Sequence, residues 1–283
     1  MRFGRLLLLG VLVWHVRGES GTARPNGIRE GSTIVSPQGA SGRIPLRSTD
    51  RLPEASGTVR LERKGGTTEL EVEVDSMKPA SLFGGDYNTY VLWVVPPRGV
   101  AENRGEIILD GSRGKVHAST DATSFALLIT AEPHYLVSSP SAFVILENQR
   151  TGERPIQYRV LEGVYNFKRA TLDNEKEAKG VVHTEVRQAF TAVRLAQRAG
   201  AEDLARGEFR KAERALNQTL NLWRQRVDRK DIAAQARETV RLAVAAERLA
   251  TDRGLQAGRF EMEGSGGGNE ETGSRDPRGS DSK

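Results

Sequence analysis

Three histidines, His117, His134 and His183, lie beyond residue 20, and the chain contains no cysteine. None of the histidines has the H-E-x-x-H spacing or another zinc spacing, and thiolate ligands are absent. The sequence also lacks the G-x-S-x-G pattern of a serine nucleophile and the D-x-D-x-D-G pattern of a calcium loop. We therefore predict a protein without catalytic residues, metal or cofactor.

An acid and a histidine come close together in the stretch Glu132-Pro133-His134-Tyr135. Residues two apart on a strand share a face, so Glu132 and His134 could form an acid–base pair. The alternative is a partly exposed histidine at the end of a strand, which is the interpretation we favour. His134 and Tyr135 are kept as candidate residues of an interaction surface.

A second cluster combines aromatic and polar residues in the stretch from Phe83 to Trp93. Aromatic rings beside a polar glycine loop can form a face on which sugars stack. In the alternative interpretation, which we favour, Tyr90 or Trp93 fills the core while Asp86 and Asn88 shape the turn. The candidate surface therefore contains four residues here: Asp86, Tyr87, Tyr90 and Trp93.

The first eighteen residues have the pattern of a secretory signal peptide. A basic start is followed by an apolar run from Leu6 to Trp14 and by Gly18. This run is far shorter than the roughly 20 residues that span a bilayer, so no transmembrane anchor is expected. An exported chain without cysteine indicates a bacterial protein. We expect it in the periplasm of a Gram-negative bacterium.

The composition changes twice along the rest of the chain. Residues 19–56 are rich in Gly, Ser, Pro and Arg, which predicts a disordered linker. Residues 57–165 hold an alternating segment at 67–74 and short apolar runs separated by turn signals, for example 90–95 and 125–130. Seven or eight strands at this spacing predict an antiparallel β-sandwich, with immunoglobulin-like topology as the default.

Helical periodicity begins near Asn166 and predicts an α-helical bundle over residues 166–262. Three apolar stripes with spacings of three and four residues indicate about three antiparallel helices, and Asp228 is a plausible cap for the third. The stripes consist of Val182, Val186, Ala189, Val193 and Ala196; of Phe209, Ala212, Leu216, Leu220 and Trp223; and of Ile232, Ala236, Val240, Ala243 and Ala250. Residues 263–283 are predicted to be a disordered tail. The fold class is thus α+β in separate domains.

The charge is distributed unevenly. The whole chain has a formal net charge of +5, and residues 168–259 hold 20 Lys and Arg against 13 Asp and Glu. A basic helical half could contact anionic polymers or headgroups of the envelope. Nucleic acid is not an expected partner, because the chain is exported and carries no nucleic-acid motif.

Several segments resemble a family of bacterial envelope proteins of unknown function. The resemblance covers residues 58–253 and rests on the stretches 81–95, 101–106, 129–134, 143–148 and 192–202. In that family a signal peptide precedes a β-module and an alanine-rich helical domain, and some members continue into an OmpA-type peptidoglycan-binding domain. The resemblance does not extend to that last domain, and it supplies no catalytic residues.

These observations lead to two functional hypotheses. In the first, the chain is a non-enzymatic structural or protein-interaction module of the periplasm, with envelope proteins or peptidoglycan as partners. In the second, the aromatic region of the β-module binds a glycan or peptidoglycan, which requires Tyr87, Tyr90 and Trp93 to be exposed. The oligomeric state does not follow from the sequence.

Overall fold

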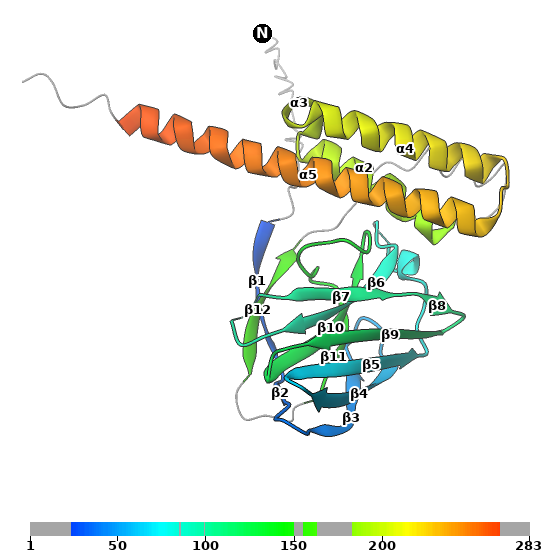
Figure 1. Cartoon of the computed structure of the whole chain (residues 1–283), viewed down its shortest axis with the longest axis vertical. Coiled ribbons are helices and arrows are strands. Elements are labelled where there is room, and N and C mark those ends of the chain that lie inside the picture. The colour runs from blue at the N-terminus through cyan, green and yellow to red at the C-terminus, as the bar shows by residue number, and fades with distance from the viewer. Residues whose placement is uncertain (1–23, 85, 99, 150–154, 163–182, 267–283) are drawn as a thin grey trace, which may run out of the picture.

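The structure is a computed structural model that describes residues 24–84, 86–98, 100–149, 155–162 and 183–266. Strands occupy the first part of these residues and helices the second, so the α+β class is confirmed (Figure 1). The helices lie together above one end of the sheet. None of the described helices combines the length and apolar character needed to cross a membrane. The predicted signal peptide, residues 1–18, lies outside the described residues.

The described residues form twelve strands and one short 3₁₀ helix. The strands are β1 (Arg24–Gly31), β2 (Ile34–Val35), β3 (Ser41–Ser48), β4 (Ser56–Lys64), β5 (Thr67–Asp75), β6 (Thr89–Val95), β7 (Glu102–Ile107), β8 (Leu109–Asp110), β9 (Arg113–Thr120), β10 (Ser124–Glu132), β11 (Val144–Asn148) and β12 (Ile156–Glu162). The 3₁₀ helix η1 (Ala80–Phe83) precedes β6.

Ten of these strands form one antiparallel sheet that nearly closes on itself. Its strand order is β7-β6-β10-β11-β3-β4-β5-β9-β8, and β2 pairs with β10. Only Ile108 separates β7 from β8, and this stretch pairs with β6 through β7 and with β9 through β8. At Gly114 a side chain would meet Ile107 Cγ2 at 2.6 Å, so glycine allows β9 to approach β7.

This single path of strands does not support the immunoglobulin-like sandwich. Such a sandwich consists of two facing sheets, whereas here one large sheet curves around its own core. The second sheet contains only β1 and β12, and it covers the outer side of β6 and β10 around Trp93 and Tyr158.

Two strands are buried on both faces, and this explains their continuous apolar sequence. Every residue of β6 is buried, as is nearly every residue of β10, because the enclosed core lies on one side and β1 and β12 on the other. Strand β5 instead alternates between buried inward residues and half-buried or exposed outward ones, since its outer face meets solvent.

The predicted disordered linker at residues 19–56 is wrong for its described part, because residues 24–48 include three strands. In β3 only Ile44 and Leu46 point into the core, so few apolar residues mark the strand. Strand β1 pairs with β12, more than 120 residues later in the chain. At Gly31 a side chain would lie 2.8 Å from Ala126 Cβ, so the glycine allows close packing.

Four helices of the described residues follow the strands: α2 (Thr184–Arg198), α3 (Ala201–Leu204), α4 (Arg206–Arg224) and α5 (Arg229–Gly266). Every described residue of the three predicted stripes is buried, while Val182 lies outside the described residues. The backbone N–H of Lys230 donates to Asp228 Oδ1 at 2.8 Å, so the predicted cap is confirmed. The short α3 was not expected, and α5 runs four residues into the predicted tail.

Candidate functional site

The aromatic residues of the candidate surface lie inside the protein. Tyr87, Tyr90 and Trp93 are each at most 3% exposed. The Trp93 indole N–H donates to Thr130 Oγ1 at 2.8 Å, and the Tyr90 hydroxyl donates to the Lys78 carbonyl at 2.5 Å. The favoured interpretation, in which Tyr90 or Trp93 fills the core, is therefore confirmed, and these buried rings do not form the alternative sugar-stacking face.

The polar residues of the same loop connect the sheet to the helices. Asp86 and Asn88 are both buried. The Asn88 side-chain amide donates to the carbonyls of Asp86 and Pro133, each at 2.9 Å, and to Thr191 Oγ1 on α2 at 3.1 Å. The loop therefore positions α2 on the end of the sheet. A loop with this structural role has the same polar, glycine-rich composition as a ligand-binding loop, so the sequence alone does not distinguish the two.

Glu132 is fully buried beside this loop, two residues from His134. Its Oε1 accepts hydrogen bonds from the Thr130 hydroxyl and the Ser141 backbone N–H, whereas Oε2 has no partner. Burial raises the pKa of Glu132 to about 8. At neutral pH the carboxyl is therefore mainly protonated, because removal from water disfavours its charged form. No hydrogen bond or ion pair joins Glu132 to His134 in the described structure, so the alternative of an acid–base pair is not supported.

A polar network, which we call the interface network, holds the helices against β7. Glu106 Oε2 accepts from Arg237 of α5 at 2.5 Å, and its Oε1 accepts from Gln188 of α2 at 2.7 Å and from Thr89 at 2.6 Å. The backbone N–H of Tyr135 donates to Gln188 Oε1 at 2.9 Å. Three separate segments of the chain thus meet at one carboxylate.

Tyr135, one of the sequence-predicted residues, belongs to this interface. The Arg237 guanidinium lies 4.7 Å from the centre of its ring, which is a cation–π distance. The Tyr135 hydroxyl also donates to the Arg237 carbonyl at 3.3 Å. Tyr135 is therefore half-buried between sheet and helices and is a packing residue of the interface.

His134 is only 1% exposed, so the expectation of a partly exposed histidine is wrong. It lines a cleft of about 540 Å³ between the sheet and the helices, which we call the interface cleft. The described residues that line it come from four parts of the chain: His134, Leu136, Val137 and Ser138 after β10; Leu161 of β12; Leu195, Arg198 and Ala199 at the end of α2; and Val244, Glu247, Arg248, Thr251 and Asp252 of α5.

The protonation of His134 determines the chemistry available in the interface cleft. Burial lowers the pKa of His134 to about 3, so the ring is neutral. Its Nδ1 accepts from the Leu136 backbone N–H at 3.2 Å, which places the remaining hydrogen on Nε2. A serine nucleophile needs a histidine nitrogen that can accept its proton. His134 in this tautomer instead offers a hydrogen-bond donor, so it is not a base for Ser138.

The carboxyl group of Glu247, which also lines the cleft, has a raised pKa. Burial raises the pKa of Glu247 to about 7, and the positive charge of Arg248 opposes this shift. The same charge contributes to the low pKa of His134, so Arg248 lies near both residues. The cleft therefore combines apolar walls with a group of hydrogen-bond donors.

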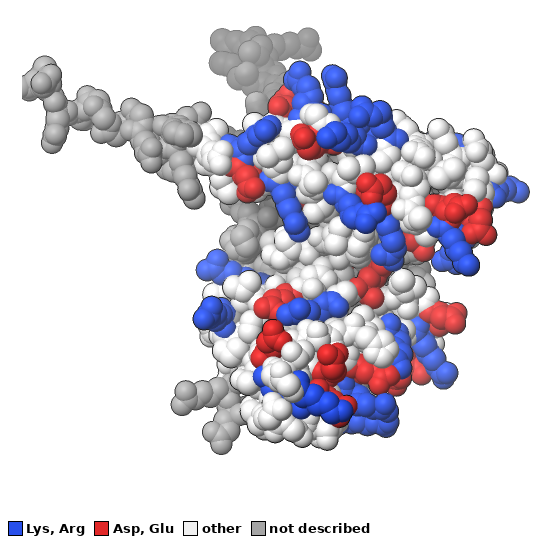
Figure 2. Space-filling view, viewed as in Figure 1, with Lys and Arg blue, Asp and Glu red and all other residues white. Residues whose placement is uncertain are grey.

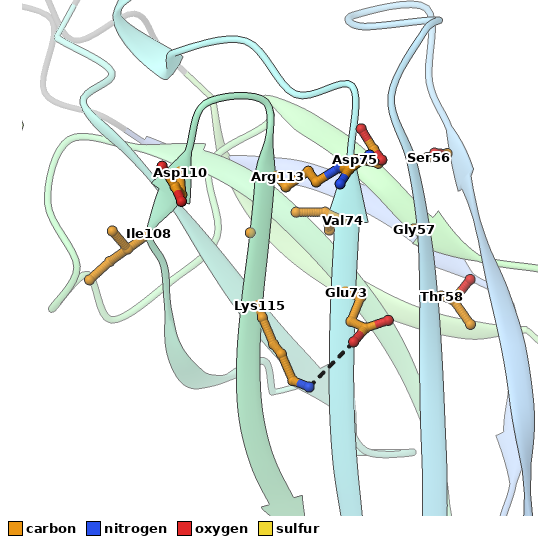
Figure 3. A pocket seen from close by; sticks show the side chains of 11 residues that line it. Ser56, Gly57, Thr58, Glu73, Val74, Asp75, Ile108, Asp110, Arg113 and Lys115 are labelled. Atoms are coloured by element: carbon orange, nitrogen blue, oxygen red, sulfur yellow. Dashed lines mark hydrogen bonds and ion pairs between the residues drawn. The ribbon is translucent and has the colours of Figure 1, made fainter.

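A larger depression, about 710 Å³, lies on the outer face of β4, β5 and β9 (Figure 3). Apart from Asp110, its described charged side chains pair across the strands. Arg113 donates to Asp75 at 3.0 Å, and Lys115 lies 3.3 Å from Glu73 and also pairs with Glu71. Exposed pairs of this kind contribute little free energy. This face is an ordinary sheet surface without converging unpaired groups.

The outer face of α4 carries four exposed basic residues, together with the exposed Glu213 three residues after Arg210. Arg206, Arg210 and Arg214 are spaced by four residues and lie along one side of the helix, with Lys211 beside them. All four are exposed, and among the described residues only Arg206 has an ion pair, at 3.6 Å to Asp203. Helix α4 packs on the other helices, and Lys and Arg side chains gather over this layer away from the sheet (Figure 2). We call these four residues the α4 basic face.

The comparisons with known proteins found no match to this chain: no family model, no curated protein and no solved structure matches it. Within the described ranges, no group of three or more His, Asp and Glu is arranged to hold a metal ion. The function proposed below therefore rests on the chain's own residues.

The structure brings only some of the predicted candidate residues together. Tyr87, Tyr90 and Trp93 belong to the core, and Asp86 is buried near the contact with α2. His134 and Tyr135 reach the interface between sheet and helices. The residues that complete this interface, Glu106, Gln188, Arg237, Glu247 and Arg248, were not selected from the sequence. Polar residues on the apolar side of α2 and α5, such as Gln188 between Val186 and Ala189, were the available signal.

Proposed function

We propose that this chain is an exported, non-enzymatic interaction module of a Gram-negative cell envelope that docks on peptidoglycan through the α4 basic face. The signal-peptide pattern of residues 1–18 supports export. The resemblance of residues 58–253 to bacterial envelope proteins agrees with this compartment. In this proposal the sheet and helices form one platform, and the partner is bound on the outside of the helical layer.

The α4 basic face is the observation that carries the proposal. The stem peptides of peptidoglycan carry free carboxylates, which complement a row of exposed guanidinium groups. Arg210, Lys211 and Arg214 have no ion pair with a described residue, so no internal pair has to break on docking. Each exposed cation near an anionic surface contributes about 1 kcal/mol at low salt. Several together can give useful avidity on a polymer.

Sedimentation of the mature chain with purified peptidoglycan sacculi tests this proposal. The variant R206Q/R210Q/R214Q is compared with R29Q/R43Q/R98Q, which removes the same charge from exposed arginines that have no ion pair with a described residue. We expect the first variant to bind about tenfold more weakly or worse, and the control to bind nearly as the parent does. Added salt should weaken binding of the parent.

Two results would contradict the proposal. Equal sedimentation of both triple variants would show that net charge, and not the α4 basic face, controls binding. Absence of sedimentation for the parent at low salt would exclude peptidoglycan as the partner. Photo-crosslinking from position 217 on the same helix, in intact cells, would then identify an envelope protein if one is bound instead.

A further inference from the structure

We propose that the interface cleft is a binding site for a carboxylate with an apolar body, of the fatty-acid type. This proposal is independent of the α4 basic face, because the cleft lies on the opposite side of the helical layer, against the sheet. It rests on the shape of the cleft, its apolar walls and a group of donors that converge at one part of it.

The walls of the cleft come from both halves of the protein. Leu136, Val137 and Leu161 contribute from the sheet side, and Leu195 and Val244 from the helices. A volume of about 540 Å³ lies within the range of 300–1,000 Å³ that small-molecule sites occupy. Such sites occur preferentially between domains and have mainly apolar walls with a few placed polar groups. An acyl chain fits this lining.

The polar part of the cleft offers donors for an anion. His134 is buried, and its Nε2–H has no acceptor among the described residues, although the ring lines the cleft. The Arg248 guanidinium has no ion pair within the described ranges and acts electrostatically on both His134 and Glu247. A carboxylate placed here would accept from the imidazole and the guanidinium together. Such charge-assisted bonds are stronger than neutral ones.

The charges of the lining favour a single negative charge on the ligand. Arg248 contributes a positive charge that has no ion pair with a described residue, and the exposed Asp252 contributes a negative charge. Glu247 titrates near neutral pH and is mainly protonated below pH 7. The Arg248 cation then lies in the same cleft as the imidazole N–H donor of His134, which suits a carboxylate better than a cation. A neutral alcohol would fill the walls but leave the donors without a charged partner.

Calorimetric titration of the full mature chain at pH 6 with decanoate and decanol tests the proposal. The variant R248Q is paired with R241Q, which removes the same charge from an exposed arginine on the same helix outside the cleft. We expect decanoate to bind R248Q about tenfold more weakly than the parent, and R241Q like the parent. Decanol should bind more weakly than decanoate and should not distinguish the variants.

A second pair of variants tests the position of the ligand without disturbing the core. T251W places a large ring at an exposed position that lines the cleft, whereas A245W places it at an exposed position of the same helix outside the cleft. We expect T251W to abolish decanoate binding and A245W to preserve it. Decanoate binding that survives T251W, or that is equal in R248Q and the parent, would overturn the proposal. So would the absence of decanoate binding to the parent.

Discussion

Charged residues on the two sides of the helical layer differ in burial and in ion pairing. On the side facing the sheet, Glu106 is 7% exposed in its side chain and meets Arg237, Gln188 and Thr89. On the far side, Arg210, Lys211 and Arg214 are exposed and lack ion pairs with described residues. Buried charges need partners because they have lost water, whereas exposed charges do not. We therefore expect the first group to control stability and the second to control binding.

The largest effect on stability is expected for E106A. This substitution removes the acceptor of three side chains, and a buried partner left unpaired costs several kcal/mol. Because Arg237 remains partly exposed, at 34% for its side chain, we expect a loss of about 3 kcal/mol in the free energy of unfolding. Urea unfolding measures it. The control E102A removes a half-exposed carboxylate of the same strand and should change stability by less than about 0.5 kcal/mol. Equal effects of both substitutions would show that the interface network around Glu106 does not account for the loss of stability.

The next effect depends on pH and concerns the buried carboxyl of Glu132. Its pKa rises from an ordinary value of 4.5 to about 8 in the folded protein. Between these values the folded state holds a proton that the unfolded state releases, so stability falls as the pH rises. E132Q keeps an acceptor for Thr130 and Ser141 but carries no titratable group. We expect it to be more stable than the parent by about 2 kcal/mol at pH 8 and similar at pH 4.5.

Urea unfolding of both proteins between pH 4.5 and 8 checks this prediction. The difference between parent and E132Q isolates Glu132 from His134 and Glu247, which titrate in both. His134 contributes the opposite slope, because its pKa falls to about 3 on folding and stability is then lost below pH 6.5. A difference between the two proteins that does not change with pH would mean that Glu132 is ionised in the fold.

The order of strands and helices could be predicted from the sequence because local pattern determines it. The alternation at residues 67–74 became β5, and the apolar runs at 90–95 and 125–130 became β6 and β10. The helical stripes were confirmed for the same reason. An apolar face must be buried, and the spacing of its apolar residues can be read from a short continuous segment of the sequence. These features need no knowledge of distant partners.

The features that sequence patterns missed depend on distant partners. Strands β1 and β3 contain few apolar residues and are held by β12, β11 and β4. Asn88 resembles a binding-loop residue until Thr191, more than 100 residues away, is placed beside it. The same limit applies to Glu106, whose neighbours come from α2 and α5. The spacing of residues along the chain carries no information about contacts between distant segments. The residues of the interface between sheet and helices were therefore not selected from the sequence.

A smaller loss is expected for T191V, which tests one contact between sheet and helix. Thr191 is completely buried and accepts one of three hydrogen bonds from the Asn88 amide. The substitution keeps the shape but removes one of the three acceptors that the two amide hydrogens share, at a cost of about 1 kcal/mol. Thermal and urea unfolding measure the change. T251V, at an exposed helix position, should be nearly neutral, and a similar loss there would point to helix propensity instead of the lost bond.

The smallest change in stability is expected where binding should change most. R206Q/R210Q/R214Q removes exposed side chains whose only ion pair with a described residue, Arg206 with Asp203, is itself exposed. Surface pairs of this kind contribute between zero and 1 kcal/mol, and glutamine preserves helix propensity. We expect the free energy of unfolding to change by less than about 0.5 kcal/mol while binding to sacculi weakens. A loss of stability as large as that of E106A would mean that α4 packs against a surface through these arginines, and the outer side of the helical layer would then not be available for a partner.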